Sequence, residues 1–382
     1  MRIAFLNWRD STHPEGGGAE KYAETVCRGL AARGHDVTLL CAHHTDSPTD
    51  EVVEGVRVLR QGGRLGVYAA SVRRLRRLER AEGAFDVVID TQNGLPFWAA
   101  LGTRSPVVVL VHHVHREQWP IVFGPITARA GWLIESVVAP RVLGRHQYVA
   151  VSQQTKQELG ELGVPTDRVA VIHNGTDEPT DLDVPKSEVP RLVVLGRLVP
   201  HKRVEHAVQV LARLLTGHPD LHLRVVGDGW WAEHIRTEAR RLGVEHRVDL
   251  LGHVDEHAKN VELARAWVHL APSVKEGWGL SVVEAASHAT PTVAYQGSGG
   301  LSESIVDGST GALVADLDDM ASTVERLLHD RPLLAALGAA AQDHAARFTW
   351  NRTIDAWEVL LLRVSMGVAP VGTTDATEPV DR

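Results

Sequence analysis

The chain has 382 residues, of which 44% are hydrophobic and 23% are charged, and its formal net charge at pH 7 is −8. This length exceeds what one hydrophobic core usually serves, so we expect two domains, and the composition excludes wholesale disorder. The negative charge argues against nucleic acid as a partner, because a phosphate backbone needs a surplus of Lys and Arg.

The only two cysteines, Cys27 and Cys41, lie in a helical pattern and at the end of an apolar run. Both are expected to be small buried hydrophobic residues. The apolar run of residues 1–6 is too short for a signal peptide, and no later run is long enough to cross a bilayer. The sequence therefore predicts a cytoplasmic location.

In the first half of the chain, short runs of β-branched residues alternate with helical patterns. Such alternation predicts parallel strands joined by crossover helices. A helix is expected over residues 19–33, between a triple-glycine loop at 16–18 and a terminating Gly34. The strands predicted for this half are residues 3–6, 37–41, 87–90, 107–111 and 149–152.

Residues 181–190 are polar and carry two prolines, as expected of a linker between domains. The alternation then restarts, with strands predicted at 191–196, 221–226, 248–251, 267–271 and 292–295. We therefore predict an α/β fold with two doubly wound, Rossmann-like domains that face each other across a cleft. The expected parts are domains at 1–180 and 191–349, a helix at 350–366 that packs back on the first domain, and a mobile tail at 367–382.

The strongest local signal is the segment 276–284, which follows a predicted strand and opens a helix. Gly277 and Gly279 allow the backbone to approach a ligand closely. The N–H groups of Leu280 and Ser281 at the helix start would face an anion, and the helix dipole favours negative charge there. This arrangement suits a diphosphate.

The same segment carries two glutamates, Glu276 before the helix and Glu284 within it. Their separation along the helix would direct the two carboxylates to different parts of one bound molecule, such as a sugar and a ribose. A capped helix with two solvated glutamates is the alternative interpretation.

A second signal is the pair of cations Arg197 and Lys202, which follow the strand predicted at 191–196. Ligand groups gather at the carboxyl ends of parallel strands. Two fixed cations there would stabilise the negative charge on a departing diphosphate. The alternative is that both are ordinary surface charges.

In this order and at these distances, the signals resemble the family-four retaining glycosyltransferases, which have the GT-B architecture of two facing Rossmann-like domains. The resemblance spans nearly the whole chain. The further motifs that carry it are the triple-glycine loop at 16–18, His112 after the strand 107–111, VAVS at 149–152, HNGTD at 173–177 and VGDG at 226–229.

The resemblance implies a role for each matching residue. Arg197 and Lys202 would bind the donor diphosphate, and Glu284 would bind the ribose. His112 and Glu276 would contact the transferred sugar. The implied catalytic residues are His112, Arg197, Lys202 and Glu276, and the implied donor-binding residues are Gly17, Gly18, Arg197, Lys202, Gly279, Leu280, Ser281 and Glu284.

Three histidines close together, His112, His113 and His115, suggest a metal site as an alternative. Adjacent residues of an extended chain point to opposite faces, and no HExxH pattern accompanies them. The resemblance implies that cations and helix N–H groups neutralise the diphosphate. We therefore expect no metal and no cofactor, and we take His112 as the imidazole that faces the donor sugar.

Residues 64–80 have the pattern of a basic amphipathic helix. Its apolar positions include Leu65, Tyr68 and Leu75, and the other positions carry Arg73, Arg74, Arg76, Arg77 and Arg80. Such a helix lies on an anionic membrane surface or packs its apolar face on the sheet, and the sequence leaves both open. The apolar, proline-broken stretch 119–126 is a candidate acceptor groove. If the helix at 64–80 lies on an anionic membrane, the protein is expected to associate peripherally with the inner face of the membrane.

The resemblance thus implies retaining transfer of a hexose from a UDP- or GDP-linked donor to a hydroxyl of a glycan, lipid-linked or small-molecule acceptor. A nucleotide-sugar epimerase on the same scaffold and a non-catalytic nucleotide-sugar-binding protein are the alternatives. A nicotinamide-dependent dehydrogenase fits less well, because the opening loop lacks a GxGxxG pattern.

Overall fold

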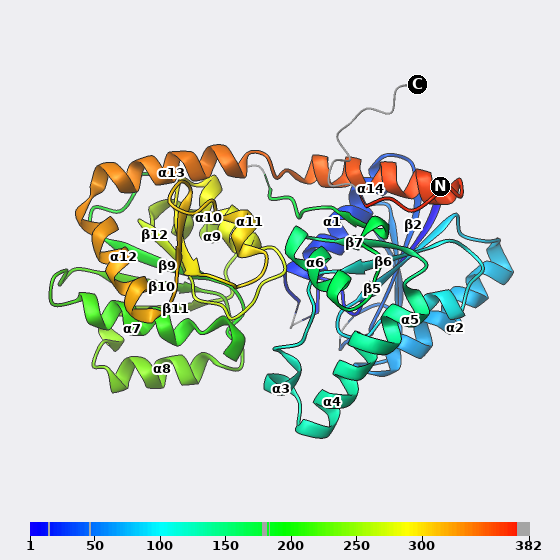
Figure 1. Ribbon diagram of the computed structural model, residues 1–382, viewed down its shortest axis with the longest axis horizontal. Helices are drawn as coiled ribbons and strands as arrows, with labels where there is room; N and C mark the ends of the chain where they lie inside the picture. The colour runs from blue at the N-terminus through cyan, green and yellow to red at the C-terminus, as the bar shows by residue number, and fades with distance from the viewer. Residues whose placement is uncertain (14–15, 46, 178–181, 183, 373–382) are drawn as a thin grey trace. The chain divides into compact units, whose positions relative to one another are not determined.

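The computed structural model describes residues 1–13, 16–45, 47–177, 182 and 184–372. The chain divides into two compact units, which are drawn in Figure 1. Unit 1 comprises Met1–Gly175 and the segment that begins at Trp350, and unit 2 comprises Thr176–Thr349. Of the expected linker, residues 181 and 183 lie outside the described residues, as do residues 373–382 of the expected tail.

Unit 1 is built on an eight-stranded sheet with the strand order β3-β4-β2-β1-β5-β6-β7-β8. Every neighbouring pair is parallel except β3 and β4, which are antiparallel. The strands are β1 Arg2–Leu6, β2 Asp36–Cys41, β3 Asp50–Val53, β4 Val56–Arg60, β5 Val87–Gln92, β6 Val107–Val111, β7 Gln147–Ala150 and β8 Val169–Val171.

Helices cover both faces of the sheet of unit 1. They are α1 Gly18–Ala32, α2 Gly66–Glu82, α3 Trp119–Val122, α4 Pro125–Leu133, α5 Ala139–Leu143, α6 Gln153–Glu161 and α14 Trp350–Ser365. Because side chains alternate along a strand, Ala4 and Leu6 of β1 join the core beneath α2, α5 and α6. Phe5 points to the opposite face, where it contacts Trp357 of α14.

Unit 2 contains a six-stranded sheet in the order β11-β10-β9-β12-β13-β14, and all its neighbouring strands are parallel. The strands are β9 Arg191–Leu195, β10 His222–Val226, β11 Val248–Gly252, β12 Val268–Ala271, β13 Thr292–Tyr295 and β14 Gly311–Val314. The helices are α7 Val204–Leu214, α8 Ala232–Arg241, α9 Glu256–Arg265, α10 Leu280–Ser287, α11 Leu301–Ser304, α12 Leu317–His329 and α13 Arg331–Ala345. Leu192 and Val194 of β9 face one apolar cluster and Val193 faces another, so helices pack on both sides.

The expected α/β class with two doubly wound sheets is confirmed. The strand predicted at 149–152 lies two residues earlier, at β7, and β3, β4, β8 and β14 were not predicted. The first two of these contain charged residues, two acids before the valines of β3 and two arginines in β4, and the last two are only three and four residues long. Both cysteines are buried and free. No helix among the described residues is long and apolar enough to span a membrane.

Helix α2 packs its apolar face on the sheet of unit 1. Val67, Leu75 and Leu78 are buried in the core there, while Arg73, Arg76, Arg77 and Arg80 are exposed. The prediction that Leu65 belongs to the apolar face is wrong, because Leu65 precedes the helix and is 75% exposed. The core therefore uses the apolar face, and the arginines remain on the surface.

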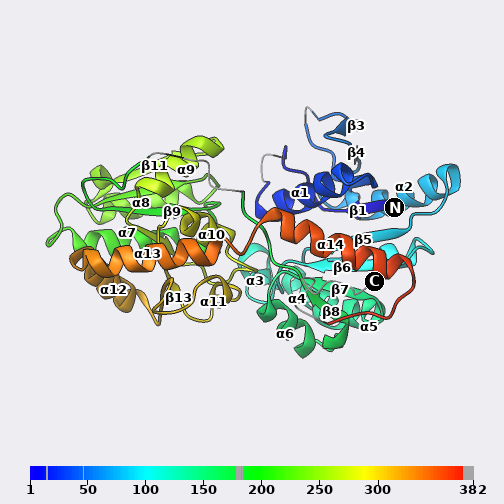
Figure 2. The same cartoon turned by 90° about the horizontal axis from the view of Figure 1, so that it is seen from above.

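Helix α14 is held against α1 by close packing (Figure 2). A Cβ atom on Gly29 of α1 would lie 2.3 Å from Cδ1 of Ile354, so the glycine permits the contact. The buried Trp357 indole donates a hydrogen bond of 2.6 Å to the Tyr22 hydroxyl. The two ends of the unit 1 sequence thus share one aromatic core.

Replacing Trp357 with Ala should lower the free energy of unfolding of unit 1 by about 3–5 kcal/mol, because a fully buried indole leaves a cavity. Denaturant unfolding followed by circular dichroism measures the change. Leu362→Ala, on the exposed side of the same helix, is the matched control and should cost far less. Equal losses for the two variants would contradict the packing of α14 on α1.

Candidate functional site

The sheet of unit 2 reverses its strand order between β9 and β12. The chain leaves these two neighbouring strands toward opposite sides, and ligands bind such open sheets at the crevice outside the carboxyl ends of the strands. Two loops begin there, residues 196–203 after β9 and residues 272–279 after β12. They carry Arg197, Lys202 and Glu276.

The loop after β9 is fixed by its backbone. Gly196 N–H donates to the Val226 carbonyl at 3.0 Å, and Leu198 N–H donates to the Asp228 carbonyl at 2.9 Å. Leu198 is buried, whereas the side chain of its neighbour Arg197 is exposed and makes no hydrogen bond or ion pair with another described residue. The loop therefore fixes the backbone of Arg197 at the edge of the sheet, and its guanidinium is available to a ligand.

Lys202 and Glu276, predicted from separate motifs, form an ion pair. Glu276 also accepts a hydrogen bond of 2.6 Å from the Ser273 hydroxyl. Burial alone raises the pKa of Glu276, but the Lys202 charge and the hydrogen bonds from Lys202 and Ser273 outweigh it and hold the pKa below its ordinary value. The site thus contains an ionised carboxylate and an ammonium group side by side.

Helix α10 begins directly after this pair. Its N-cap residue, Gly279, has a φ of +90°, and a Cβ there would lie 2.4 Å from Leu301 Cδ2. A larger residue would be both strained and overpacked. The N–H groups of Leu280 and Ser281 make no hydrogen bond with another described residue. They are two unpaired donors at a helix N-terminus, which is a favourable environment for an anion.

Glu284 lies further along α10 and is paired with Lys259 of α9 at 2.6 Å. Lys259 also contacts Glu256 at 2.6 Å. Burial alone lowers the pKa of Lys259, but the two carboxylates outweigh it and raise the pKa above its ordinary value. Lys259 was not predicted from the sequence, because the pair joins residues 25 positions apart on different helices.

In unit 1, His112 follows β6 directly and is 6% exposed. Its ring packs edge-on against Tyr22, with 5.3 Å between centroids, and its Nε2 atom has no hydrogen-bond partner. Burial, with a smaller effect of His115, lowers the pKa of His112 to about 4. The imidazole is therefore neutral at pH 7 and keeps one polar atom for a ligand.

The two other histidines of this loop are occupied by protein partners. His113 Nε2 contacts Gln118 Oε1 at 2.7 Å. His115 contacts the buried Glu135 at 3.0 Å and Asn93 at 2.8 Å. Within the described residues, no three His, Cys, Asp or Glu side chains are arranged to hold a metal ion. His113 and His115 thus use ring nitrogens in hydrogen bonds with protein groups, whereas Nε2 of His112 has no partner.

The two predicted glycines of unit 1, Gly17 and Gly18, begin helix α1. Gly17 has extended backbone and is the N-cap, and its N–H donates to the Glu20 carboxylate at 2.8 Å. Glu20 is itself buried. The N–H group of Gly17, one of the two glycines that the resemblance assigns to the donor, is thus already paired with an acid.

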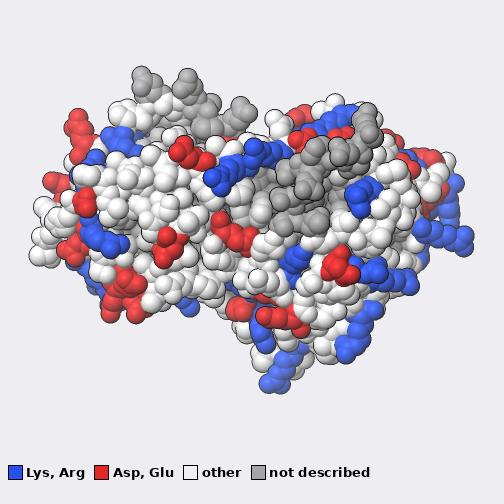
Figure 3. Space-filling view, turned by 45° about the horizontal axis from the view of Figure 1, so that its top comes forward, with Lys and Arg blue, Asp and Glu red and all other residues white. Residues whose placement is uncertain are grey.

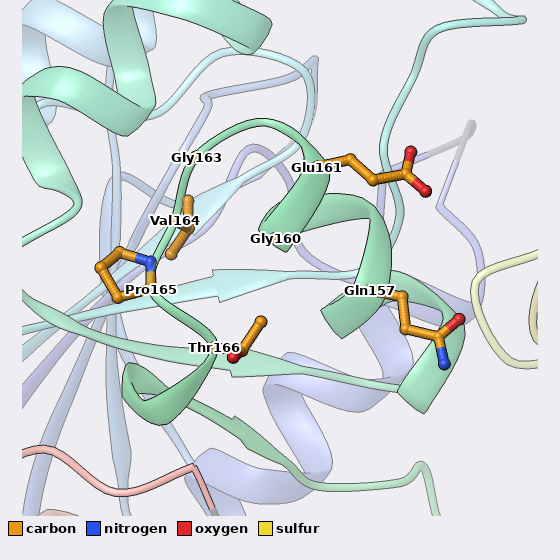
Figure 4. Close-up of a pocket in the computed structure, with 7 residues that line it drawn as sticks. All are labelled: Gln157, Gly160, Glu161, Gly163, Val164, Pro165 and Thr166. Atoms are coloured by element: carbon orange, nitrogen blue, oxygen red, sulfur yellow. The ribbon is translucent and has the colours of Figure 1, made fainter.

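A cavity of about 650 Å³ lies at the end of α6 in unit 1 and is drawn in Figure 4. It is lined by Gln157, Gly160, Glu161, Gly163, Val164, Pro165 and Thr166. None of these is a predicted site residue. The cavity is therefore separate from the groups that carry the candidate chemistry.

The two halves of the chain match two family models. Residues 182–344 match the model described as glycosyl transferases group 1, and residues 16–178 match the model described as glycosyltransferase family 4. A D-inositol 3-phosphate glycosyltransferase of Corynebacterium diphtheriae is 38% identical over 92% of this chain and 92% of its own length. An exopolysaccharide phosphotransferase of Streptomyces coelicolor is 30% identical over 94% of this chain, which spans only 40% of that protein.

Solved structures show the same fold. A sucrose-phosphate synthase from Thermosynechococcus elongatus has a TM-score of 0.82 at 20% identity, covering 96% of this chain and 99% of its own. Anabaena HepE in complex with UDP and glucose has a TM-score of 0.71 at 20% identity, covering 95% of this chain and 99% of its own.

The depressed pKa of His112 predicts a pH dependence of stability. The unfolded imidazole binds a proton near its ordinary pKa of 6.5, whereas the folded one binds it near pH 4, so its contribution is complete above pH 6.5 and is lost as the pH falls toward 4. The loss should reach up to about 3 kcal/mol. Denaturant unfolding of wild type and His112→Asn across pH 4.5–7 measures it. The variant should show a shallower slope, and parallel curves would contradict the buried, neutral imidazole.

Proposed function

Since this chain belongs to the family-four glycosyltransferases and has their GT-B fold, we propose that it transfers a hexose from a UDP- or GDP-linked donor with retention of configuration. The acceptor is a hydroxyl of a glycan, a lipid-linked saccharide or a small molecule. Glycosyl transfer itself is the activity of the family. The UDP and glucose bound to a protein of the same fold support the choice of donor class.

The observation that carries the proposal is the group of anion-binding elements at the β9–β12 edge of unit 2. The Arg197 guanidinium, the Lys202 ammonium and the unpaired N–H groups at the start of α10 all belong to this edge. They suit a diphosphate that gains negative charge as its bond to the sugar breaks. Because Lys202 is held by its ion pair and the N–H groups by the helix, these donors need little reorganisation at that moment.

In the proposed reaction, the acceptor oxygen bonds to the anomeric carbon while the bond from that carbon to the diphosphate oxygen breaks. The acceptor approaches the face from which the diphosphate leaves, and its proton passes to a diphosphate oxygen. No separate carboxylate base is assigned. Glu276 contacts the transferred sugar, and its ion pair with Lys202 couples sugar binding to the cation that holds the leaving group.

The remaining assignments concern recognition. Glu284 binds the ribose hydroxyls as an acceptor, and Lys259 orients its carboxylate. His112 contacts the transferred sugar, which its unpartnered Nε2 atom and neutral state support. Gly17 and Gly18 lie near the phosphates in this proposal, with Gly18 the better donor because the Gly17 N–H is used by Glu20.

Contact with an anionic membrane through residues 64–80 is also part of the proposal. Four arginines of α2, Arg73, Arg76, Arg77 and Arg80, are exposed, whereas its apolar face belongs to the core. Such contact is therefore electrostatic and weakens as salt screens it.

Lys202→Ala should lower kcat about 100- to 1000-fold, as loss of a preorganised group at a developing charge does in other enzymes. Release of nucleoside diphosphate and formation of glycosylated product, measured with UDP- and GDP-hexoses, report the effect. Arg213→Gln, an exposed arginine of unit 2, is the control and should keep normal turnover. Near-normal turnover of a folded Lys202→Ala protein would exclude this role, and product without any acceptor would favour an epimerase.

A chelator should leave turnover unchanged, because Arg197, Lys202 and the helix N–H groups are proposed to neutralise the diphosphate. Initial rates are compared with and without EDTA, after dialysis against the chelator. A large loss that Mg²⁺ or Mn²⁺ restores would refute metal-independent transfer.

A further inference from the structure

The turn between α3 and α4 of unit 1 is an exposed apolar surface. Residues 120–127 are eight consecutive exposed residues without a charged side chain, and we call them the α3–α4 tip. Four of them are large and hydrophobic, namely Ile121, Val122, Phe123 and Ile126, with exposures of 41%, 52%, 37% and 84%. Contiguous apolar surface of this kind marks a site of interaction with an apolar partner.

The tip is held in place by a packed base. A Cβ on Gly131 would lie 2.4 Å from the Trp119 ring, so α3 and α4 are in close contact beneath the tip. The Trp119 indole donates to Glu135 at 2.7 Å, and Glu135, with no exposed surface, also accepts from the His115 backbone at 3.1 Å. The apolar side chains of the tip are therefore exposed to solvent, because the packing of Trp119, Gly131 and Glu135 fixes the positions of α3 and α4.

The border of the tip is basic. The exposed Arg116 and Arg129 flank it in the sequence, and Glu117 is only partly exposed, whereas Arg141 and Arg145 lie in α5 and just after it, more than ten residues from the tip. On the outer face of α4, Arg129 lies between Ile126 and Leu133, and Leu133 is 55% exposed. In Figure 3 the surface at the lower edge, where α3 and α4 project in Figure 1, shows white surface with blue side chains, and red side chains lie above it. An apolar centre with a basic rim is complementary to anionic lipid.

We propose that the α3–α4 tip inserts its apolar side chains into the surface of an anionic membrane while the neighbouring arginines bind the lipid headgroups. This goes beyond the contact proposed for α2, because it adds an apolar component that salt does not screen. The inference concerns membrane binding and does not depend on which sugar or acceptor the enzyme uses.

The test is co-sedimentation of the full chain with vesicles of phosphatidylglycerol and phosphatidylcholine, and of phosphatidylcholine alone, at 0.1 and 0.5 M NaCl. The tip variant is Phe123→Ser with Ile126→Ser, which changes only exposed side chains. Leu101→Ser removes an equally exposed hydrophobic residue elsewhere on unit 1 as the matched control. Arg73→Gln with Arg77→Gln reports the contribution of α2. No donor is present, so an error in the proposed reaction does not affect the readout.

We expect wild type to bind anionic vesicles and to keep part of this binding at 0.5 M NaCl. The tip variant should lose the salt-resistant part, so that its partition coefficient is about one tenth of the wild-type value or smaller. The Leu101 variant should bind like wild type. Binding that salt abolishes completely, or a tip variant that binds like wild type, would overturn it. The proposal would also be overturned if the wild type dimerised without binding vesicles and the tip variant did not dimerise. The tip would then bind a second copy of the chain.

Discussion

The candidate chemistry depends on one ion pair, between Lys202 after β9 and Glu276 after β12. Neither loop could form it alone, and the parallel sheet brings the loops together because β9 and β12 are neighbours whose chains leave in opposite directions. The partly buried setting makes each charge costly without the other. The order of the strands thus determines how Lys202 and Glu276 are oriented, and in our proposal both face the same bound donor.

A comparable dependence links distant parts of unit 1. Trp357, near the C-terminal end, donates to Tyr22, and the Tyr22 ring packs edge-on against His112. The environment that keeps His112 neutral is therefore completed by a helix whose residues lie more than 200 positions later in the sequence. This explains why α14 is structurally part of unit 1, although the chain passes through all of unit 2 before reaching it.

The sequence predicted what short-range patterns encode. The strand 107–111 was predicted with the bounds of β6, and Gly34, expected to end the first helix, has a φ of +86° two residues after it. Lys259 was missed and Leu65 was wrong for a common reason: burial and pairing depend on neighbours that are remote in sequence. The ion pair between Lys202 and Glu276 was not predicted for the same reason, because the two residues lie 74 positions apart in the sequence. The roles assigned to the site residues remain predictions.

The central claim is that Lys202 holds the charge of the departing diphosphate. Calorimetric titration of wild type and Lys202→Met with a nucleoside diphosphate and with the matching nucleoside tests it directly, using whichever of UDP and GDP the wild type binds. We expect the variant to bind the diphosphate about 10- to 100-fold more weakly, because it loses a charge-assisted contact, and to bind the nucleoside with unchanged affinity. Equal affinity of both proteins for the diphosphate would contradict it.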